Sequence, residues 1–174
     1  MRFPQEKLRQ LEQELKTIPE NQQAEQRRAR IEQWLDSGLG SCVLQNPAIA
    51  KIVQEALLYH AGERYRLLAW CVMPNHVHVL VSVVRPLDKI VQTWKSFTAH
   101  RVKALAAPGM PFPFWQRDYW DRYMRDDRHL LATLDYIHNN PVKAGLCTTA
   151  RDWQWSSARL AEATPPGATA SPPS

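Results

Sequence analysis

Residues 65–82 read YRLLAWCVMPNHVHVLVS, and this stretch decides the fold. The apolar run 65–73 predicts a buried strand. Pro74 and Asn75 predict a turn, and 76–82, rich in valine and alternating with polar residues, predicts a partner strand. The sequence therefore predicts a strand–turn–strand unit at the centre of the chain.

Two histidines stand on the second strand of this unit. Because alternate side chains of a strand share a face, His76, His78 and Leu80 point one way and the valines between them point the other. The two imidazoles then lie about 6.6 Å apart along the strand and can converge on one divalent ion. The alternative is that both histidines are polar residues of a half-exposed strand whose hydrogen bonds are satisfied without a metal. The absence of nearby thiolates disfavours a closed zinc site and leaves an open site for magnesium, manganese or catalytic zinc.

Helices surround this unit in the predicted fold. Apolar residues at helical spacing, together with cap and stop signals, predict five helices. They are expected at 5–18, at 21–36, from Asn46-Pro47 to a point before Gly62, at 87–106 and at 127–140, with Pro141 ending the last. We interpret 1–162 as a single domain that includes a solvated helical hairpin at 1–38. Residues 114–124 are expected to form a short strand or an irregular edge, and 163–174 a disordered tail rich in Pro, Ala and Ser.

Composition excludes several classes of protein. The chain has 174 residues and a net charge of +5, which favours a polyanionic partner. No apolar run approaches a membrane span or the core of a signal peptide, so we expect a cytoplasmic protein that does not bind membranes. Three scattered cysteines form neither a disulfide framework nor a metal pair. No glycine-rich phosphate loop is present, so a mechanism driven by ATP or NAD is not expected.

The predicted helix at 127–140 carries a second set of polar residues. Leu130, Leu134 and Ile137 form its apolar face, whereas Tyr136 and Asn140 lie one turn apart on another face. A phenol and an amide would project together from that face. The pattern alone favours a surface tyrosine followed by a helix-ending asparagine, unless this face meets the histidine pair.

Four motifs occur in a fixed order along the chain. They are MPNHVHVLV at 73–81, Trp115-Gln116, YIHNNPVKAGL at 136–146 and Trp155-Ser156-Ser157. Together they resemble the HUH single-tyrosine transposases, and most of all their REP-associated branch. The resemblance spans roughly residues 40–160 and is far more specific than a His-x-His pair.

The resemblance implies an α/β (α+β) domain in which helices flank an antiparallel sheet, like the ferredoxin-like fold of HUH endonucleases. It implies that His76 and His78 bind a divalent metal (Mg²⁺ or Mn²⁺), that Asn140 is a third ligand, and that Tyr136 is the nucleophile. Attack on a phosphodiester would give a 5′-phosphotyrosine and a free 3′-hydroxyl, and rejoining would need no ATP. A nearby cation should favour the phenolate of Tyr136.

The expected substrate is single-stranded DNA near a hairpin, bound in the nucleoid by a monomer or a homodimer. Candidate DNA-binding residues are basic or aromatic side chains on the fourth helix and near the tyrosine helix. They are Lys95, Arg101, Lys103, Trp115, Arg117, Arg122, Arg125, Arg128 and Lys143. Core packing is the alternative role for Trp115. Tyr119 and Tyr123 are rival nucleophiles, but neither has an amide one turn away.

The chain departs from the family at its start. The family begins with a strand before the first helix, and we expect the fold to lack that strand, which would leave an open sheet edge. Two other functions therefore stay open. One is a catalytically inactive protein that binds single-stranded DNA hairpins, and the other is a metallohydrolase that uses the same histidines, although no Asp or Glu ligand follows them closely in sequence.

Overall fold

The computed structural model describes residues 4–105, 113–116 and 119–160. Its elements in chain order are α1 (Gln5–Leu15), α2 (Glu20–Asp36), η1 (Val43–Gln45), α3 (Pro47–Tyr59), β1 (Tyr65–Val72), β2 (Val77–Val83), α4 (Leu87–Ala104), α5 (Asp127–Lys143), η2 (Ala150–Asp152) and η3 (Ser157–Arg159). The predicted α/β class is confirmed. None of the described helices is long and apolar enough to cross a membrane. The tail predicted at 163–174 lies outside the described residues.

The sheet is the predicted hairpin. β1 and β2 pair antiparallel, with Cys71 opposite His78 and Val72 opposite Val77, and the register shifts between Leu67 and Ala69. Among the described residues the sheet has these two strands. The described part of 114–124 forms neither helix nor strand, which agrees with the irregular edge expected there.

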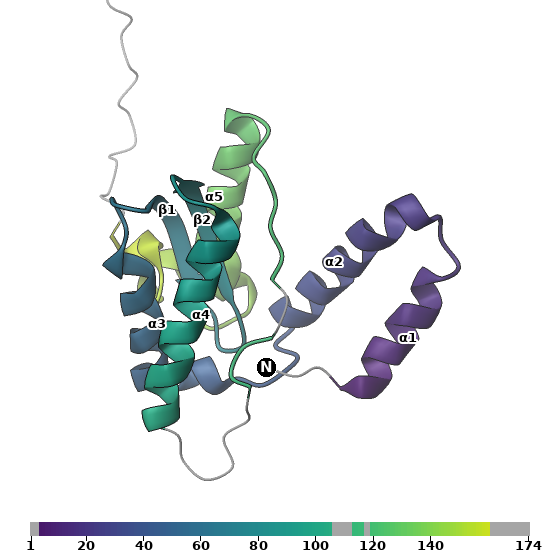
Figure 1. Cartoon of the computed structure of the whole chain (residues 1–174), viewed down its shortest axis with the longest axis horizontal. Coiled ribbons are helices and arrows are strands. Elements are labelled where there is room, and N and C mark those ends of the chain that lie inside the picture. The colour runs from purple at the N-terminus through teal and green to yellow at the C-terminus, as the bar shows by residue number, and fades with distance from the viewer. Residues whose placement is uncertain (1–3, 106–112, 117–118, 161–174) are drawn as a thin grey trace, which may run out of the picture.

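Helices cover both faces of the sheet (Figure 1). α3 and α4 lie on one face, where Val72 and Val77 pack into a core with Ile49, Val102 and Phe114. α5 lies on the other face, where three of its apolar residues pack against Ala69, Cys71 and Leu80 of the sheet and against Met73, which follows β1. The three residues are Leu130, Leu134 and Ile137. The alternation expected for β2 is thus confirmed, because Leu80 faces α5 and Val77 faces α3 and α4.

Local capping signals place two helix starts correctly. The Oδ1 atom of Asn46 accepts a hydrogen bond from the backbone N–H of Ala48 at 3.0 Å, and Pro47 occupies the first turn of α3. Asp126 accepts from the N–H of His129 at 2.7 Å and begins α5.

The predicted end of α5 is wrong. The helix continues through Pro141 to Lys143. Asn140 and Pro141 are buried, and hydrogen bonds from Ala144 N to Asn140 O (3.0 Å) and from Leu146 N to Pro141 O (2.9 Å) continue beyond the proline. Burial of this last turn outweighs the loss of one backbone donor at Pro141.

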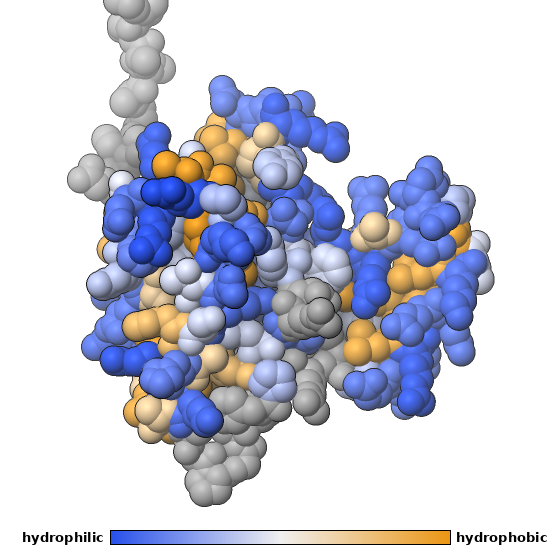
Figure 2. Space-filling view, in the orientation of Figure 1, coloured by the Kyte–Doolittle hydropathy of each residue, from blue (hydrophilic) through white to orange (hydrophobic). Residues whose placement is uncertain are grey.

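The N-terminal helices form a hairpin that projects from the body (Figure 1). α1 ends at Leu15, three residues earlier than expected. Just after this end, the hydroxyl of Thr17 donates a hydrogen bond to the carbonyl of Glu14. Leu11, Leu15 and Ile31 form a small core between the two helices. Figure 2 shows this apolar seam flanked by hydrophilic side chains, as predicted for a solvated hairpin.

A segment near residue 156 runs along the free edge of β1. The N–H of Val72 donates to the carbonyl of Trp155 at 2.8 Å, and the N–H of Trp70 donates to Oγ of Ser157 at 3.0 Å. A bridge joins Cys71 to Ser156. This segment satisfies backbone groups of β1 that would otherwise be unpaired.

Candidate functional site

The two histidines converge on one point at the start of β2. The Nε2 atoms of His76 and His78 lie 2.8 Å apart, and the ring centroids are 4.5 Å apart at an interplanar angle of 89°. His76 precedes the first residue of β2 and is buried, while His78 is partly exposed. The two rings converge as expected, but His76 lies in the turn just before the strand rather than on it.

Asn75 fixes the tautomer of His76. The side-chain Nδ2 of this buried asparagine donates to the carbonyls of Leu35 (2.8 Å) and Leu39 (2.9 Å), so its Oδ1 is the atom that faces Nδ1 of His76 at 2.8 Å. An amide oxygen can only accept, and Nδ1 therefore carries the proton. The lone pair of Nε2 is left free to bind a cation.

Sequence analysis missed Asp36, the last residue of α2. Its Oδ1 lies 3.5 Å from Nε2 of His76 and 3.7 Å from Nε2 of His78. One ligand atom from each of these three residues lies within 4.8 Å of the others, close enough to hold one metal ion. Asp36 stands 40 residues before the histidines on a polar helix, and no spacing in the sequence connects it to them.

The pKa values of this cluster follow from burial and hydrogen bonds. Partial burial alone would raise the pKa of the Asp36 carboxyl, but its polar contacts with the side chains of His76, His78, Tyr136 and Asn140 outweigh that effect and hold the pKa well below its usual range. Burial lowers the pKa of His76, against the opposing effect of Asp36. An ionised carboxylate beside a neutral imidazole is a suitable ligand set for a divalent cation.

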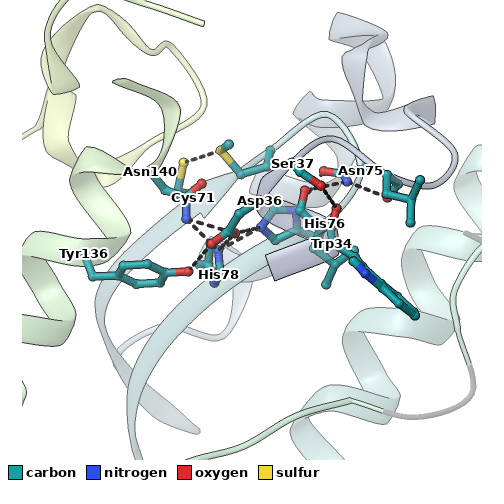
Figure 3. A network of polar contacts seen from close by, with 12 residues as sticks. Trp34, Asp36, Ser37, Cys71, Asn75, His76, His78, Tyr136 and Asn140 are labelled. Atoms are coloured by element: carbon teal, nitrogen blue, oxygen red, sulfur yellow. Dashed lines mark hydrogen bonds and ion pairs between the residues drawn. The ribbon is translucent and has the colours of Figure 1, made fainter. Parts of the chain in front are cut away.

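Tyr136 points from α5 into the same cluster (Figure 3). Its hydroxyl donates to Oδ2 of Asp36 at 2.7 Å, and its ring centroid lies 5.3 Å from that of His78. Burial raises the pKa of Tyr136, and the carboxylates of Asp36 and Glu32 raise it further. The protein's own groups thus favour the phenol, so the expected phenolate depends on a bound cation.

Asn140 lies one turn after Tyr136 and is 2% exposed. Its side-chain Nδ2 is 3.1 Å from Nε2 of His78 and 3.3 Å from Oδ1 of Asp36. The face of α5 that carries Tyr136 and Asn140 therefore meets the histidine pair. This contact favours a functional role for the two residues over a surface tyrosine and a helix-ending asparagine. Asn140 is close enough to turn its amide oxygen toward a cation held by the cluster.

The candidate DNA-binding residues that the structure describes have different surroundings. Lys95 donates to the carbonyl of Gln116 at 2.8 Å, and Arg101 lies over the ring of Phe97. The side chains of four others are exposed: Lys103, Arg122, Arg125 and Arg128. The Nζ of Lys143 lies 5.1 Å from the ring centroid of Tyr136. Arg117 lies outside the described residues.

Trp115 and the rival tyrosines stand apart from the cluster. The indole N–H of Trp115 donates to the Thr98 hydroxyl at 2.7 Å, and its ring packs against the core beneath α3 and α4. These contacts favour a packing role for Trp115. Tyr119 lies near Lys95, and the side chain of Tyr123 is 83% exposed.

Three comparisons relate the chain to known proteins. Residues 43–140 match the model of a family described as IS200-like transposases. The chain is 29% identical over 108 residues to a Haemophilus influenzae protein provisionally named REP-associated tyrosine transposase, an alignment that covers 53% of this chain and 58% of that protein. It is 26% identical over 93 residues to the REP-associated tyrosine transposase of Escherichia coli, with 53% and 54% covered. The chain thus spans about half the length of the curated relatives it matches.

The fold also matches a solved structure of a REP-associated tyrosine transposase bound to a REP hairpin. The TM-score is 0.58 at 22% sequence identity, and the match covers 69% of this chain and 70% of that one. This likeness confirms the predicted fold. Asp36 lies before the segment that matches the family model.

Proposed function

The chain belongs to the family of IS200-like transposases, and from that premise we propose that it nicks and rejoins single-stranded DNA through Tyr136. The observation that carries the proposal is the convergence of Tyr136 and Asn140 with His76 and His78. These side chains come from α5 and from the start of β2, yet their polar atoms lie around one point. The arrangement places a nucleophile beside a candidate cation site.

The donor set fits a divalent cation. Two imidazole nitrogens and a carboxylate oxygen lie within 4.8 Å of one another, and an amide is adjacent. Nitrogen and oxygen donors without thiolates suit Mg²⁺ or Mn²⁺, with Zn²⁺ as the alternative. His76, His78 and Asp36 or Asn140 would hold the ion. When bound, it would supply positive charge that polarises the scissile phosphate.

The residues of the chain then perform a transesterification. The phenolic oxygen of Tyr136 loses its proton and forms a bond to phosphorus, while the bond from phosphorus to the 3′ oxygen breaks and that oxygen gains a proton. The product is a 5′-phosphotyrosine with a free 3′-hydroxyl on the DNA. A second 3′-hydroxyl can attack the phosphotyrosine and release Tyr136. Because one phosphodiester is exchanged for another, no nucleotide is consumed.

The proposed substrate is single-stranded DNA that carries a hairpin, as in the REP hairpin bound to the solved relative. Exposed basic side chains flank Tyr136 along the chain and would contact phosphates; they are Arg122, Arg125, Arg128 and Lys143. Lys95, Arg101 and Lys103 of α4, together with Trp115 and Arg117, would extend the contact. Such a protein would act in the cytoplasm as a monomer or a homodimer.

A metal-dependent phosphodiesterase is the second candidate. Asp36 supplies the carboxylate that the sequence around the histidines lacks, so His76, His78 and Asp36 could activate water instead of orienting Tyr136. Hydrolysis would leave no bond between protein and DNA. That difference separates the two functions.

The experiment is a denaturing gel of the full chain with labelled single-stranded DNA that carries hairpins from the flanks of its own gene. The reactions contain Mn²⁺ or Mg²⁺, or a chelator. We expect label at the size of the protein with metal, and none with Tyr136→Phe or the chelator. Cleaved DNA without attached protein would support the phosphodiesterase. Hairpin binding without cleavage would support an inactive DNA-binding protein.

A further inference from the structure

The α1–α2 hairpin meets the body of the protein at the candidate site. Along most of their length α1 and α2 pack on each other around Leu11, Leu15 and Ile31. At the end of α2 the carbonyls of Leu35 and Leu39 accept hydrogen bonds from Asn75, the residue that holds His76. The hairpin is therefore anchored to the same turn that begins the histidine pair.

Asp36 lies between Leu35 and Leu39 in the sequence, and its two carboxylate oxygens face different partners. Oδ2 accepts a hydrogen bond from the Tyr136 hydroxyl at 2.7 Å. Oδ1 faces the Nε2 atoms of His76 and His78 at 3.5 and 3.7 Å. One rigid group thus lies between the nucleophile and the histidines, and Figure 3 shows it there.

We propose that Asp36 couples the nucleophile to the cation, with Oδ1 as a ligand beside His76 and His78 and Oδ2 as the acceptor that aligns Tyr136. The inference rests on the proposed strand-transfer function and extends it to a helix outside the segment that matches the family. A carboxylate can serve both partners at once because its two oxygens have separate lone pairs. The hairpin becomes a structural part of the reaction centre.

Two substitutions of Asp36 test its two tasks. Asp36→Asn keeps an oxygen that can accept from Tyr136 but removes the negative charge that a cation requires. Asp36→Glu keeps the charge but adds one methylene, which moves both oxygens away from their present partners. Glu25→Gln is the matched control, because it removes one carboxylate from an exposed position on the same helix. The side chain of Asp36 is 33% exposed, so these small changes leave the fold intact, as thermal melting will verify.

The first measurement is Mn²⁺ affinity of the full chain by isothermal titration calorimetry, without DNA. We expect Asp36→Asn to weaken Mn²⁺ binding about tenfold or more, the range typical of altered ligand shells. Glu25→Gln and Tyr136→Phe should bind Mn²⁺ within about twofold of the wild type. An Asp36→Asn variant that binds Mn²⁺ as tightly as the wild type would overturn the ligand role.

The second measurement is the single-turnover rate of covalent adduct formation at saturating Mn²⁺, with the affinity for hairpin DNA measured in parallel. We expect Asp36→Glu to lower the rate about tenfold or more while DNA affinity stays unchanged, because a displaced acceptor misaligns Tyr136. A wild-type rate in Asp36→Glu would overturn the aligning role.

The two proposals can fail separately. If the wild type forms no adduct with any hairpin DNA, the strand-transfer function fails, and the Mn²⁺ titration still decides whether Asp36 is a ligand. If the wild type forms the adduct and both Asp36 variants match it in rate and in Mn²⁺ affinity, only the role of Asp36 fails.

Discussion

The hydroxyl of Tyr136 donates a 2.7 Å hydrogen bond to Oδ2 of Asp36, a residue 100 positions earlier in the chain. The bond joins the end of α2 to the middle of α5 across the start of β2. It holds the phenol in one orientation before any DNA arrives. Orientation of this kind lowers the entropic cost of reaching the attacking geometry.

Tyr136→Phe is expected to abolish the covalent protein–DNA adduct and to leave the affinity for hairpin DNA within about threefold of the wild type. The substitution removes only the proposed attacking oxygen and one hydrogen bond, so the free energy of unfolding should fall by about 1 kcal/mol. A denaturing gel and urea unfolding measure the two effects. Tyr123→Phe is the matched control and should change neither, because that side chain is 83% exposed. Adduct formation by Tyr136→Phe would assign the nucleophile elsewhere.

His78→Ala should lower Mn²⁺ affinity by about tenfold or more, because one of the two proposed imidazole ligands is lost. Addition of a chelator to the wild type should stop adduct formation, and excess Mn²⁺ should restore it. Calorimetry and the denaturing gel measure these results. His100→Ala, at an exposed position of α4, should leave both unchanged. Equal Mn²⁺ affinity in the two variants would remove His78 from the metal site.

Asn75→Ala should lower the free energy of unfolding by about 1–3 kcal/mol, because the part-buried carbonyls of Leu35 and Leu39 and Nδ1 of His76 each lose a hydrogen bond. Asn75→Asp should also destabilise, since a carboxylate can accept from His76 but cannot donate to Leu35 and Leu39. Urea unfolding is the measurement. Asn139→Ala is the control, because that exposed amide bonds only within its own helix, to Asp135. An Asn75→Ala variant with the wild-type free energy of unfolding would show that the hydrogen bonds of Asn75 contribute little to stability.

Tyr65→Phe should lower the free energy of unfolding by about 1–3 kcal/mol. The buried Tyr65 hydroxyl donates to the carbonyl of Leu57 at 2.8 Å and accepts from the indole N–H of Trp94 at 2.9 Å. Its loss leaves both groups without that partner and loosens the contact of α3 and α4 with β1. Urea unfolding checks this, with the exposed Tyr59→Phe as control. An equal loss in both variants would argue against the bridging role of Tyr65.

Cys71 should make stability fall at high pH. Burial raises the pKa of its thiol from about 9 to about 12. Below pH 9 both the folded and the unfolded chain keep the proton, so the thiol has no effect. Between pH 9 and 12 only the unfolded chain loses it, which lowers the free energy of unfolding by about 1.4 kcal/mol per pH unit.

Urea unfolding at pH 8 and pH 10.5 measures this effect. Cys71→Ala should reduce the loss of stability between the two pH values. Cys42→Ala should leave the loss as in the wild type, because that thiol is exposed. A Cys71→Ala variant with the wild-type loss would show that other groups cause it.

Local signals made much of the fold predictable. The caps at Asn46 and Asp126 act within three residues, and the alternation of β2 follows from strand geometry alone. Pro141 misled the prediction because burial in the last turn of α5 is a tertiary effect. Within the site, His76 and His78 could be found from spacing, whereas Asp36 could not, because only the packing of α2 against the turn at Asn75 brings it there.

The segment that lines β1 also bears on how the chain is made. The backbone of Trp70 in β1 forms hydrogen bonds with Ser157, which lies 87 residues later in the chain. The ribosome therefore synthesises both strands, β1 and β2, long before the segment near residue 156 exists. During that interval the edge of β1 is open to pairing with other chains. We therefore expect slowed translation after Val83, or truncation before Trp155, to increase aggregation during synthesis.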